Sequence, residues 1–192
     1  DKNNNNALVK SWVSSDTAAE KISLPAGNYT LIETAAPNGY VAISNVDFTV
    51  TITNGVGSIT VDKQSTTGKV EVVNGKVVIT DQTEPEEFEF SKADIFGNEI
   101  KDAKLEIQDL NDNNTVVHSW TSSDTQTEKV KLPAGEYKLV ETSAPNGYVA
   151  ITEVEFTVTI SGGKGNVTVT KQSTTGKVEY KNGKVVITDK TE

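Results

Sequence analysis

Apolar and polar residues alternate along most of the chain with a period of two. Short runs of this kind, rich in Val, Thr, Ile, Phe and Tyr, place every second side chain on one face of a strand. In the second half of the sequence they read FEFSKA, AKLEIQD, EKVKL, EYKLVET, EVEFTVTI, NVTVT, KVEY and KVVITD. No stretch shows the period of an amphipathic helix. The pattern therefore predicts an all-β fold.

Turn residues separate the predicted strands. Gly and Asn supply the positive φ that tight hairpins need. They occur at Phe96-Gly97-Asn98, Pro133-Ala134-Gly135, Pro145-Asn146-Gly147, Gly162-Gly163 and Asn182-Gly183. Seven or more short strands in about 108 residues predict an antiparallel β-sandwich.

The sequence contains an internal repeat at a shift of 108 residues. Residues 1–84 pair without gaps with residues 109–192 at roughly two-thirds identity, a pattern typical of domain arrays. Residues 85–108 have no counterpart in the first copy. The charged, proline-containing segment 83–87 marks a domain boundary. We therefore predict two tandem sandwiches: residues 1–84, which lack the first strand, and residues 85–192, which form a complete repeat.

Three ionisable residues continue the apolar faces of predicted strands. Phe88 and Phe90 share a face with Lys92, because residues two apart in a strand point the same way. Glu141 and Asp189 end the apolar stripes of EYKLVET and KVVITD in the same manner. A single residue of this kind is most simply explained as the end of a strand that turns into solvent, since Lys, Glu and Asp are rarely buried. Three together favour a buried cluster.

A buried amine beside two buried carboxyl groups has a specific chemistry. Desolvation lowers the pKa of a lysine and raises that of a carboxylic acid, so proton transfer leaves a neutral amine facing a neutral acid. We expect Lys92 to attack Asp189 and form an amide, while Glu141 hydrogen-bonds both groups and carries protons as the catalyst. Folding supplies the positioning, so neither a cofactor nor a second enzyme is needed.

The first copy contains both carboxyl residues but no matching lysine. Glu33 and Asp81 correspond to Glu141 and Asp189. The position that matches the lysine would lie upstream of the chain. We therefore expect Glu33, the equivalent catalyst, and Asp81, the equivalent acceptor, to have no covalent partner within this chain. We also expect the gap to be filled, by a strand not present here or by one donated from another molecule.

Composition and charge narrow the range of partners. The net charge of -9 repels phosphate backbones and anionic lipids, which argues against nucleic acid and membrane surfaces as partners. The sequence has no Cys and no Met, which excludes disulfides and Cys-bound metal. No apolar run approaches the roughly 18 residues of a membrane span, and the N-terminus has no signal-peptide pattern, so we expect an internal fragment of a larger protein.

The chain resembles the Cna B-type repeat domain of Gram-positive collagen adhesins and pilins over almost its whole length. The resemblance lies in FSKADIFGNEIKDAKLEI, LPAGEYKLVETSAPNGY and KVVITD. It implies an Ig-like or prealbumin-like sandwich in which a first-strand Lys is joined to a last-strand Asn or Asp, with a Glu as catalyst. Lys92, Asp189 and Glu141 fall on these positions. An Asp acceptor implies release of water rather than ammonia.

The resemblance also implies a role and a location. It identifies the chain as stalk repeats of an extracellular adhesin or pilus-like protein on the bacterial cell surface, anchored to the cell wall through regions outside this chain. The expected partners are neighbouring repeats and, through other regions of the full protein, a host extracellular-matrix protein. Because the bond forms once per molecule, we do not expect an enzyme.

Two other functions remain open. The repeats themselves can grip a host protein or glycan through a sheet edge or through the region of Trp12 and Trp120, and an exposed apolar patch would favour this function. A small hydrolase that uses paired carboxylates would need Glu141 in an open cleft.

Two weaker signals have simpler explanations. Residues 109–113 resemble the start of a calcium loop but lack its Gly and its later Glu, so an Asx-rich hairpin turn is expected and no metal site. His118, the only histidine, has no identifiable Ser or Asp partner and is predicted to be an exposed strand residue.

Overall fold

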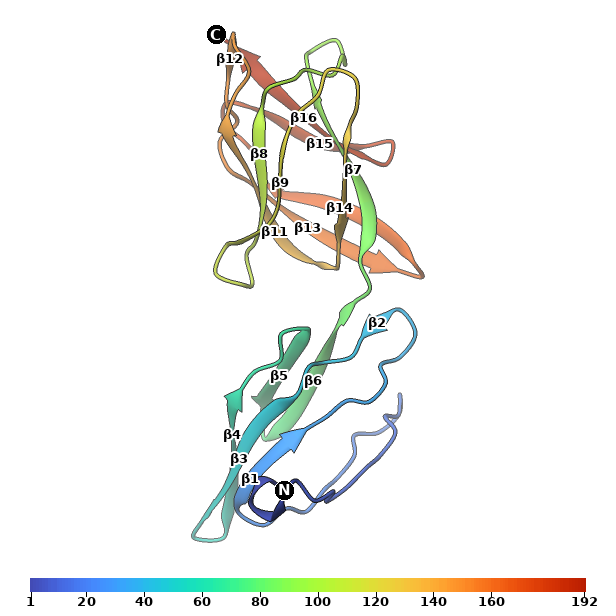
Figure 1. Cartoon of the computed structure of the whole chain (residues 1–192), viewed down its shortest axis with the longest axis vertical. Coiled ribbons are helices and arrows are strands. Elements are labelled where there is room, and N and C mark those ends of the chain that lie inside the picture. The colour runs from blue at the N-terminus through green and yellow to red at the C-terminus, as the bar shows by residue number, and fades with distance from the viewer. The chain divides into compact units, whose positions relative to one another are not determined.

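The computed structural model describes residues 1–192, which divide into two units: unit 1, residues 1–82, and unit 2, residues 83–192. Almost all regular structure is strand (Figure 1), as the period-two pattern predicts. The boundary expected from the sequence lies two residues beyond this division. The only helix is a 3-10 turn, η1 (Lys2–Asn4). No helix has the length and apolar character of a membrane span.

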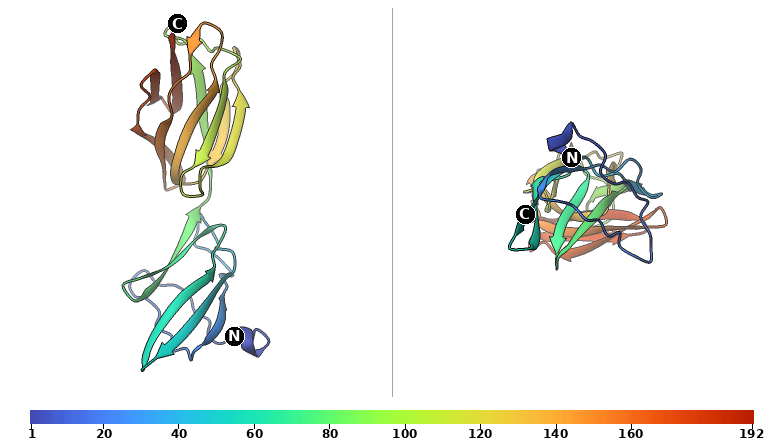
Figure 2. Two further views of the ribbon diagram at one scale, coloured as in Figure 1. Left: turned by 90° about the vertical axis from the view of Figure 1, so that its left-hand side faces the viewer. Right: turned by 90° about the horizontal axis from the view of Figure 1, so that it is seen from below.

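Unit 2 contains ten strands. They are β7 (Glu86–Ala93), β8 (Lys104–Asp109), β9 (Thr115–Thr121), β10 (Glu128–Leu132), β11 (Gly135–Ser143), β12 (Tyr148–Val149), β13 (Val154–Ser161), β14 (Lys164–Lys171), β15 (Gly176–Lys181) and β16 (Lys184–Thr191). One sheet has the order β10-β7-β16-β12, with β15 also paired to β16, and the other has the order β14-β13-β11-β8-β9. The two sheets form the layers of a sandwich (Figure 2), which confirms the predicted fold class.

The first and last strands of unit 2 lie side by side and run in parallel. Residues 184–188 of β16 pair with residues 89–93 of β7, and Ile187 lies opposite Lys92. The other strand pairs are antiparallel, as expected. A parallel pair needs a long connection between its strands, and here the rest of the domain provides it.

The core of unit 2 lies between the two sheets. All of its strands contribute buried apolar side chains to this core, except the two-residue β12 and the exposed β9. Phe90 is 1% exposed and contacts Trp120 and Phe156 edge-on, with ring centroids 5.7 and 6.2 Å apart. Trp120 is thus half-buried and packs against this core.

Most of the predicted turns have the backbone conformation that the sequence indicates. Positive φ occurs at Gly97, Gly147, Asn182 and the residues of the 162–163 turn. Gly135 is different, because it begins β11 without a positive φ. A Cβ at this position would lie 3.2 Å from the hydroxyl of Tyr137, so here the glycine makes room for a ring.

Unit 1 is a reduced version of the same fold. Its strands are β1 (Gly27–Leu31), β2 (Tyr40–Val41), β3 (Val46–Thr53), β4 (Val56–Lys63), β5 (Gly68–Val73) and β6 (Lys76–Thr83). They form two three-stranded sheets, β1-β3-β4 and β2-β6-β5. The buried apolar cluster consists of Ile43, Val46 and Val70, with Leu31 and Val61 packed against it.

The segments of unit 1 that correspond to β9 and β10 form no strands. In unit 2, β9 pairs only with β8, and β10 pairs only with β7. Unit 1 has no counterpart of β7 or β8, so residues 7–13 and 20–24 have no neighbouring strand to hydrogen-bond. Their irregular backbone follows from the missing partners, since the sequences themselves are closely similar.

Candidate functional site

Three strands from both layers of unit 2 bring Lys92, Glu141 and Asp189 together. Lys92 lies near the end of β7, and Asp189 lies on the adjacent β16, two residues beyond Ile187 on the same face. Glu141 enters from β11 of the opposite sheet. The cluster therefore lies inside the sandwich, where the alternation of side chains directs all three groups.

All three side chains are almost completely removed from solvent. The side chains of Lys92, Glu141 and Asp189 are 1%, 0% and 0% exposed. The Nζ of Lys92 directly contacts the Oδ1 of Asp189 and lies 3.1 Å from the Oε1 of Glu141. Phe90 and Ile187, the preceding apolar residues on the same strand faces, are 1% and 0% exposed. The amine thus lies between two carboxyl groups in an apolar environment.

Burial changes the acidity of Glu141. Loss of solvent raises its pKa to about 7, although the charge of Lys92 and a hydrogen bond from the backbone N–H of Ile151 act in the opposite direction. This N–H donates to Oε2 at 2.8 Å, which leaves Oε1 facing Lys92. Glu141 can therefore hold or release a proton near neutral pH, as a proton carrier must.

The Oδ2 of Asp189 has no hydrogen-bond partner, and the Oε1 of Glu141 has only its ion pair with the Nζ of Lys92 at 3.1 Å. Buried polar atoms without a partner are uncommon because they lose hydration without replacement, and they concentrate where a group has a chemical role. Glu141 thus contacts Lys92 but makes no hydrogen bond to Asp189, which differs from the expectation that it would bond both groups.

Glu99 is a further member of the site that the sequence analysis did not single out. Its Oε2 accepts a hydrogen bond from the backbone N–H of Lys92 at 3.1 Å, and its Oε1 accepts one from the hydroxyl of Ser91. The backbone of Ala93 also bridges to Glu99. Glu99 follows a glycine turn, so its position depends on the turn geometry and shows no strand periodicity. The sequence therefore offered no signal for this contact.

Unit 1 repeats the carboxyl half of this arrangement. The Oε2 of Glu33 accepts a hydrogen bond from the backbone N–H of Ile43 at 2.8 Å, as Glu141 does from Ile151. Burial raises the pKa of Asp81, and the neighbouring carboxyl group of Glu33 adds to this effect. Neither carboxyl group forms an ion pair with a lysine.

The weaker sequence signals have structural explanations. The Oδ1 of Asp109 accepts a hydrogen bond from the backbone N–H of Asn111 at 2.8 Å, which is the expected Asx turn. His118 was predicted to be exposed, but its side chain is only 31% exposed. Its Nε2 lies 2.7 Å from the Oε1 of Glu128, and its ring packs against Trp120. No group of three or more His, Cys, Asp or Glu side chains is arranged to hold a metal ion.

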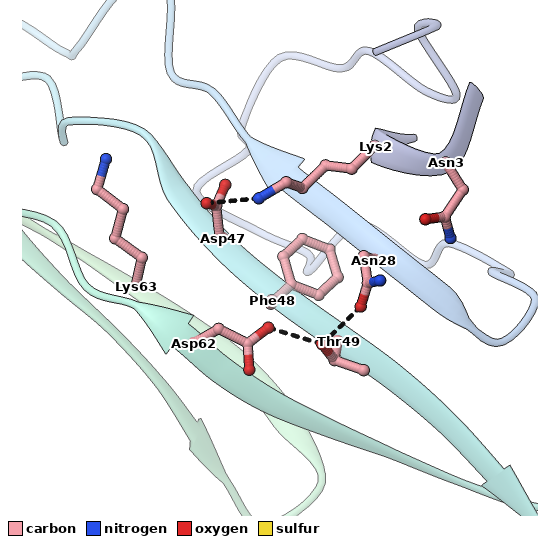
Figure 3. Close-up of a pocket in the computed structure, with 8 residues that line it drawn as sticks. All are labelled: Lys2, Asn3, Asn28, Asp47, Phe48, Thr49, Asp62 and Lys63. Atoms are coloured by element: carbon pink, nitrogen blue, oxygen red, sulfur yellow. Dashed lines mark hydrogen bonds and ion pairs between the residues drawn. The ribbon is translucent and has the colours of Figure 1, made fainter. Parts of the chain in front are cut away.

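A polar hollow of about 630 Å³ lies on the surface of unit 1 (Figure 3). Five of its charged and polar residues pair with one another. The Nζ of Lys2 lies 2.7 Å from the Oδ2 of Asp47, and the hydroxyl of Thr49 can donate either to Asn28 at 2.9 Å or to Asp62 at 2.6 Å. The pair with Lys2 lowers the pKa of Asp47. These groups are open to solvent. They do not form a buried cluster of amine and carboxyl groups like that of unit 2.

Comparison with known proteins places the chain in a family. The sequence matches the family described as SpaA, prealbumin-like fold domain, over residues 1–67 and 86–175. No curated protein matches it. The pilus adhesin SpaC of Lactobacillus rhamnosus GG in its open conformation is 18% identical, with 86% of this chain and 24% of that chain covered and a TM-score of 0.43.

Two further structures are similar at the same level. A C-terminal fragment of SpaC is 19% identical, covers 86% of this chain and 76% of that fragment, and has a TM-score of 0.42. The pilus adhesin RrgA of Streptococcus pneumoniae is 20% identical, covers 76% of this chain and 20% of that chain, and has a TM-score of 0.43. The present chain thus spans about a quarter or less of the SpaC chain in the open conformation and of the RrgA chain. Because the sequence match extends over most of both units, it bears out the predicted resemblance, and the chain belongs to the SpaA family of prealbumin-like fold domains.

Proposed function

We propose that unit 2 forms an intramolecular isopeptide bond between Lys92 and Asp189, with Glu141 as the catalyst. The observation that carries the proposal is the contact between the Lys92 amine and the Asp189 carboxyl group, with Glu141 3.1 Å from the same nitrogen and all three side chains buried. This arrangement holds the amine, the carboxyl group and the catalytic carboxyl group in position for a reaction within one molecule.

The reaction follows from the proton positions. Transfer of a proton from Lys92 to Asp189 leaves a neutral amine and a neutral acid. The Nζ then attacks the carboxyl carbon of Asp189, a new C–N bond forms, and the bond from this carbon to one oxygen breaks. Glu141 takes a proton from the nitrogen and delivers one to the departing hydroxyl, which leaves as water. The unpartnered Oδ2 of Asp189 is suited to be this leaving oxygen.

The cross-link supports a structural role. We propose that the two units are stalk repeats, or structural modules, of a cell-surface adhesin or pilus-like protein of a Gram-positive bacterium. In this role the bond would carry tension between the first and last strands of unit 2. Any host extracellular-matrix protein would bind through other regions of the full protein, and cell-wall anchoring would also lie there.

The same geometry argues against a role as a turnover enzyme. A hydrolase that uses Glu141 would need this residue open to substrate, whereas its side chain is 0% exposed. The bond would form once and remain in the protein.

Intact mass spectrometry of the purified chain tests the proposal. The expected mass is that of the 192-residue sequence minus one water. Proteolysis should release a branched peptide in which Lys92 is joined to Asp189. A chain at its full mass, or a missing water located elsewhere, would rule out the proposed bond.

A further inference from the structure

We infer that Thr175 is a positioning residue for the cross-link, because it fixes the backbone segment that binds Glu141 to the strand that carries Asp189. The inference rests on the function proposed for unit 2 and adds a residue to its site. Thr175 lies in the loop 172–175 between β14 and β15. None of its hydrogen bonds goes to a reacting group, so it would act only through the residues that it holds.

The backbone N–H of Ile151 is the point at which Thr175 would influence Glu141. Ile151 lies in the segment 150–153 between β12 and β13, and its N–H donates to the Oε2 of Glu141 at 2.8 Å. This segment belongs to no strand, so no ladder of backbone hydrogen bonds holds the N–H in place. Its orientation therefore depends on side chains that bind the residues on either side.

The hydroxyl of Thr175 binds both residues that flank Ile151. It donates to the backbone carbonyl of Ala150 at 2.7 Å and accepts from the backbone N–H of Thr152 at 2.9 Å. The Oγ of Ser173 accepts a second hydrogen bond from the N–H of Thr152 at 3.0 Å. A single hydroxyl, used both as donor and as acceptor, thus closes the backbone around the N–H that binds the catalyst.

The backbone of Thr175 connects the same loop to the acceptor strand. Its carbonyl accepts a hydrogen bond at 3.3 Å from the N–H of Lys190, the residue after Asp189. The next residue, Gly176, lies opposite Asp189 in the pairing of β15 with β16. A Cβ at Gly176 would lie 2.7 Å from the side chain of Ile151, so this glycine lets β15 lie directly against that residue. Thr175 therefore links the backbone donor of the catalyst to the acceptor strand.

The loop itself is held by a side-chain amide. The Nε2 of Gln172 donates to the backbone carbonyl of Val178 at 2.9 Å, and its Oε1 accepts from the backbone N–H of the same residue at 2.9 Å. These two hydrogen bonds join the end of β14 to β15 across the loop. Thr175 is thus placed on a fixed support, which a positioning residue needs.

The same contacts recur in unit 1. The hydroxyl of Thr67 donates to the backbone carbonyl of Ala42 at 2.8 Å and accepts from the backbone N–H of Ser44 at 2.8 Å. The residue between them, Ile43, donates its N–H to Glu33 at 2.8 Å. Both copies of the loop therefore bind the two neighbours of a residue whose N–H holds a glutamate.

A positioning role has a consequence that stability alone does not have. The N–H of Ile151 lowers the pKa of Glu141, against the larger effect of burial. The charged groups that also act on this pKa are Lys92 from β7 and Asp189 from β16. If the segment around Ile151 is loosened, its hydrogen bond weakens and the pKa of Glu141 should rise further. Loss of Thr175 should therefore change the pH dependence of cross-linking as well as its rate.

The test compares Thr175→Val, which keeps the shape but lacks the hydroxyl, with Thr175→Ser, which keeps the hydroxyl. The full chain, held in denaturant since its synthesis, is diluted into buffers of different pH. Mass spectrometry follows the loss of one water, and tryptophan fluorescence follows folding. Thr175→Val should cross-link about three- to tenfold more slowly than the wild type, and its rate should fall at a higher pH. Thr175→Ser should recover most of the rate.

Two further variants complete the test. Thr67→Val is the matched control, because it removes the corresponding hydroxyl from unit 1 and should change neither the rate nor its pH midpoint. Ser173→Ala removes only the second acceptor of the Thr152 N–H, so it should shift the midpoint in the same direction as Thr175→Val but by less. This milder variant also serves if Thr175→Val does not fold.

The outcomes separate this inference from the function proposed for unit 2. A wild-type chain that keeps its full mass would disprove the proposed function, and the inference with it. If the wild type loses one water and Thr175→Val matches it in rate and midpoint, the inference is wrong and the proposed function stands. A slower rate at an unchanged midpoint, or one that slower folding fully explains, would show that Thr175 only stabilises the fold.

Discussion

At the scale of single residues, the proposed chemistry depends on which carboxyl group holds a proton near neutral pH. Burial raises the pKa of Glu141 to about 7, and the N–H of Ile151 fixes one of its oxygens. The other oxygen is left facing Lys92 at 3.1 Å. A single side chain thus has both the acidity and the orientation of a proton carrier, and these properties can be tested separately.

Replacing Glu141 by Gln should prevent the bond without unfolding the domain. Gln has nearly the same shape and can still accept the hydrogen bond from Ile151, but it cannot carry a proton. The Glu141→Gln chain should be one water heavier than the wild type by intact mass. The matched control is Glu33→Gln, which alters the equivalent residue of unit 1 and should leave the mass loss unchanged. Normal cross-linking of Glu141→Gln would disprove the assigned role.

The rate of cross-linking should fall as the pH rises through about 7. Below this pH Glu141 is protonated, and a proton can pass from Lys92 to Asp189 without any net charge in the cluster. Above it, the ionised Glu141 adds a negative charge that holds Lys92 as an ammonium ion, and the proton for the leaving hydroxyl is lost. Protein that has been kept in denaturant since its synthesis, so that it has not yet cross-linked, can be diluted into buffers of different pH. The loss of one water is then followed over time by mass spectrometry. A rate that stays constant as the pH rises through about 7 would contradict this role of Glu141.

Glu99 should accelerate the bond without being required for it. Its two hydrogen bonds hold the backbone of Lys92 and the hydroxyl of Ser91. Each such bond contributes about 0.5–1.5 kcal/mol, so Glu99→Ala should slow cross-linking by roughly tenfold. The final product should have the same mass as the wild type, and Glu99→Gln should recover part of the rate. An unchanged rate in Glu99→Ala would exclude a positioning role.

The period of two was sufficient to predict which side chains face inward. It placed Lys92, Glu141 and Asp189 on apolar strand faces, and the structure brings these three together. It could not predict Glu99, whose contact with β7 depends on how the intervening turn folds back. The half-buried state of His118 was missed for a similar reason, since it depends on a partner from another strand.

At the scale of elements, the adjacency of β7 and β16 determines what the site can do. Alternation within each strand could be read from the sequence, but the parallel pairing of the two strands could not, because pairing depends on contacts nearly a hundred residues apart. The irregular segments of unit 1 illustrate the same limit. Their sequences closely match β9 and β10, yet they form no strands where the partner strands are absent.

The packing of β7 on β14 can be tested with one glycine in each unit. A Cβ at Gly165 would lie 2.4 Å from the ring of Phe88, whereas the same position in unit 1, Gly57, is open. Gly165→Ala should therefore destabilise unit 2 by about 1–3 kcal/mol, and Gly57→Ala should have almost no effect on unit 1. Thermal unfolding of both variants against the wild type measures the difference. Equal effects would mean that β7 does not pack as described.

At the scale of the whole molecule, the cross-link should dominate the stability of unit 2. It would close a loop whose ends are 97 residues apart, which in the chain-entropy model contributes about 4.7 kcal/mol. Loss of this contribution in Glu141→Gln should lower the unfolding temperature of unit 2 by about 15–35 °C. Calorimetry can follow the two units as separate transitions, and the transition of unit 1 should not move. A shift of only a few degrees would show that the bond contributes little.

The same bond would change the effect of proteolysis on unit 2. Joining Lys92 to Asp189 would turn the intervening chain into a closed ring, with residues 1–91 on one side and residues 190–192 on the other. The turn between β8 and β9 is exposed, so it is open to cleavage. A cut there would add one water but release no fragment, even in denaturant, whereas the same cut in Glu141→Gln would yield two pieces on a denaturing gel. An array of such rings would keep its length after its loops are cut.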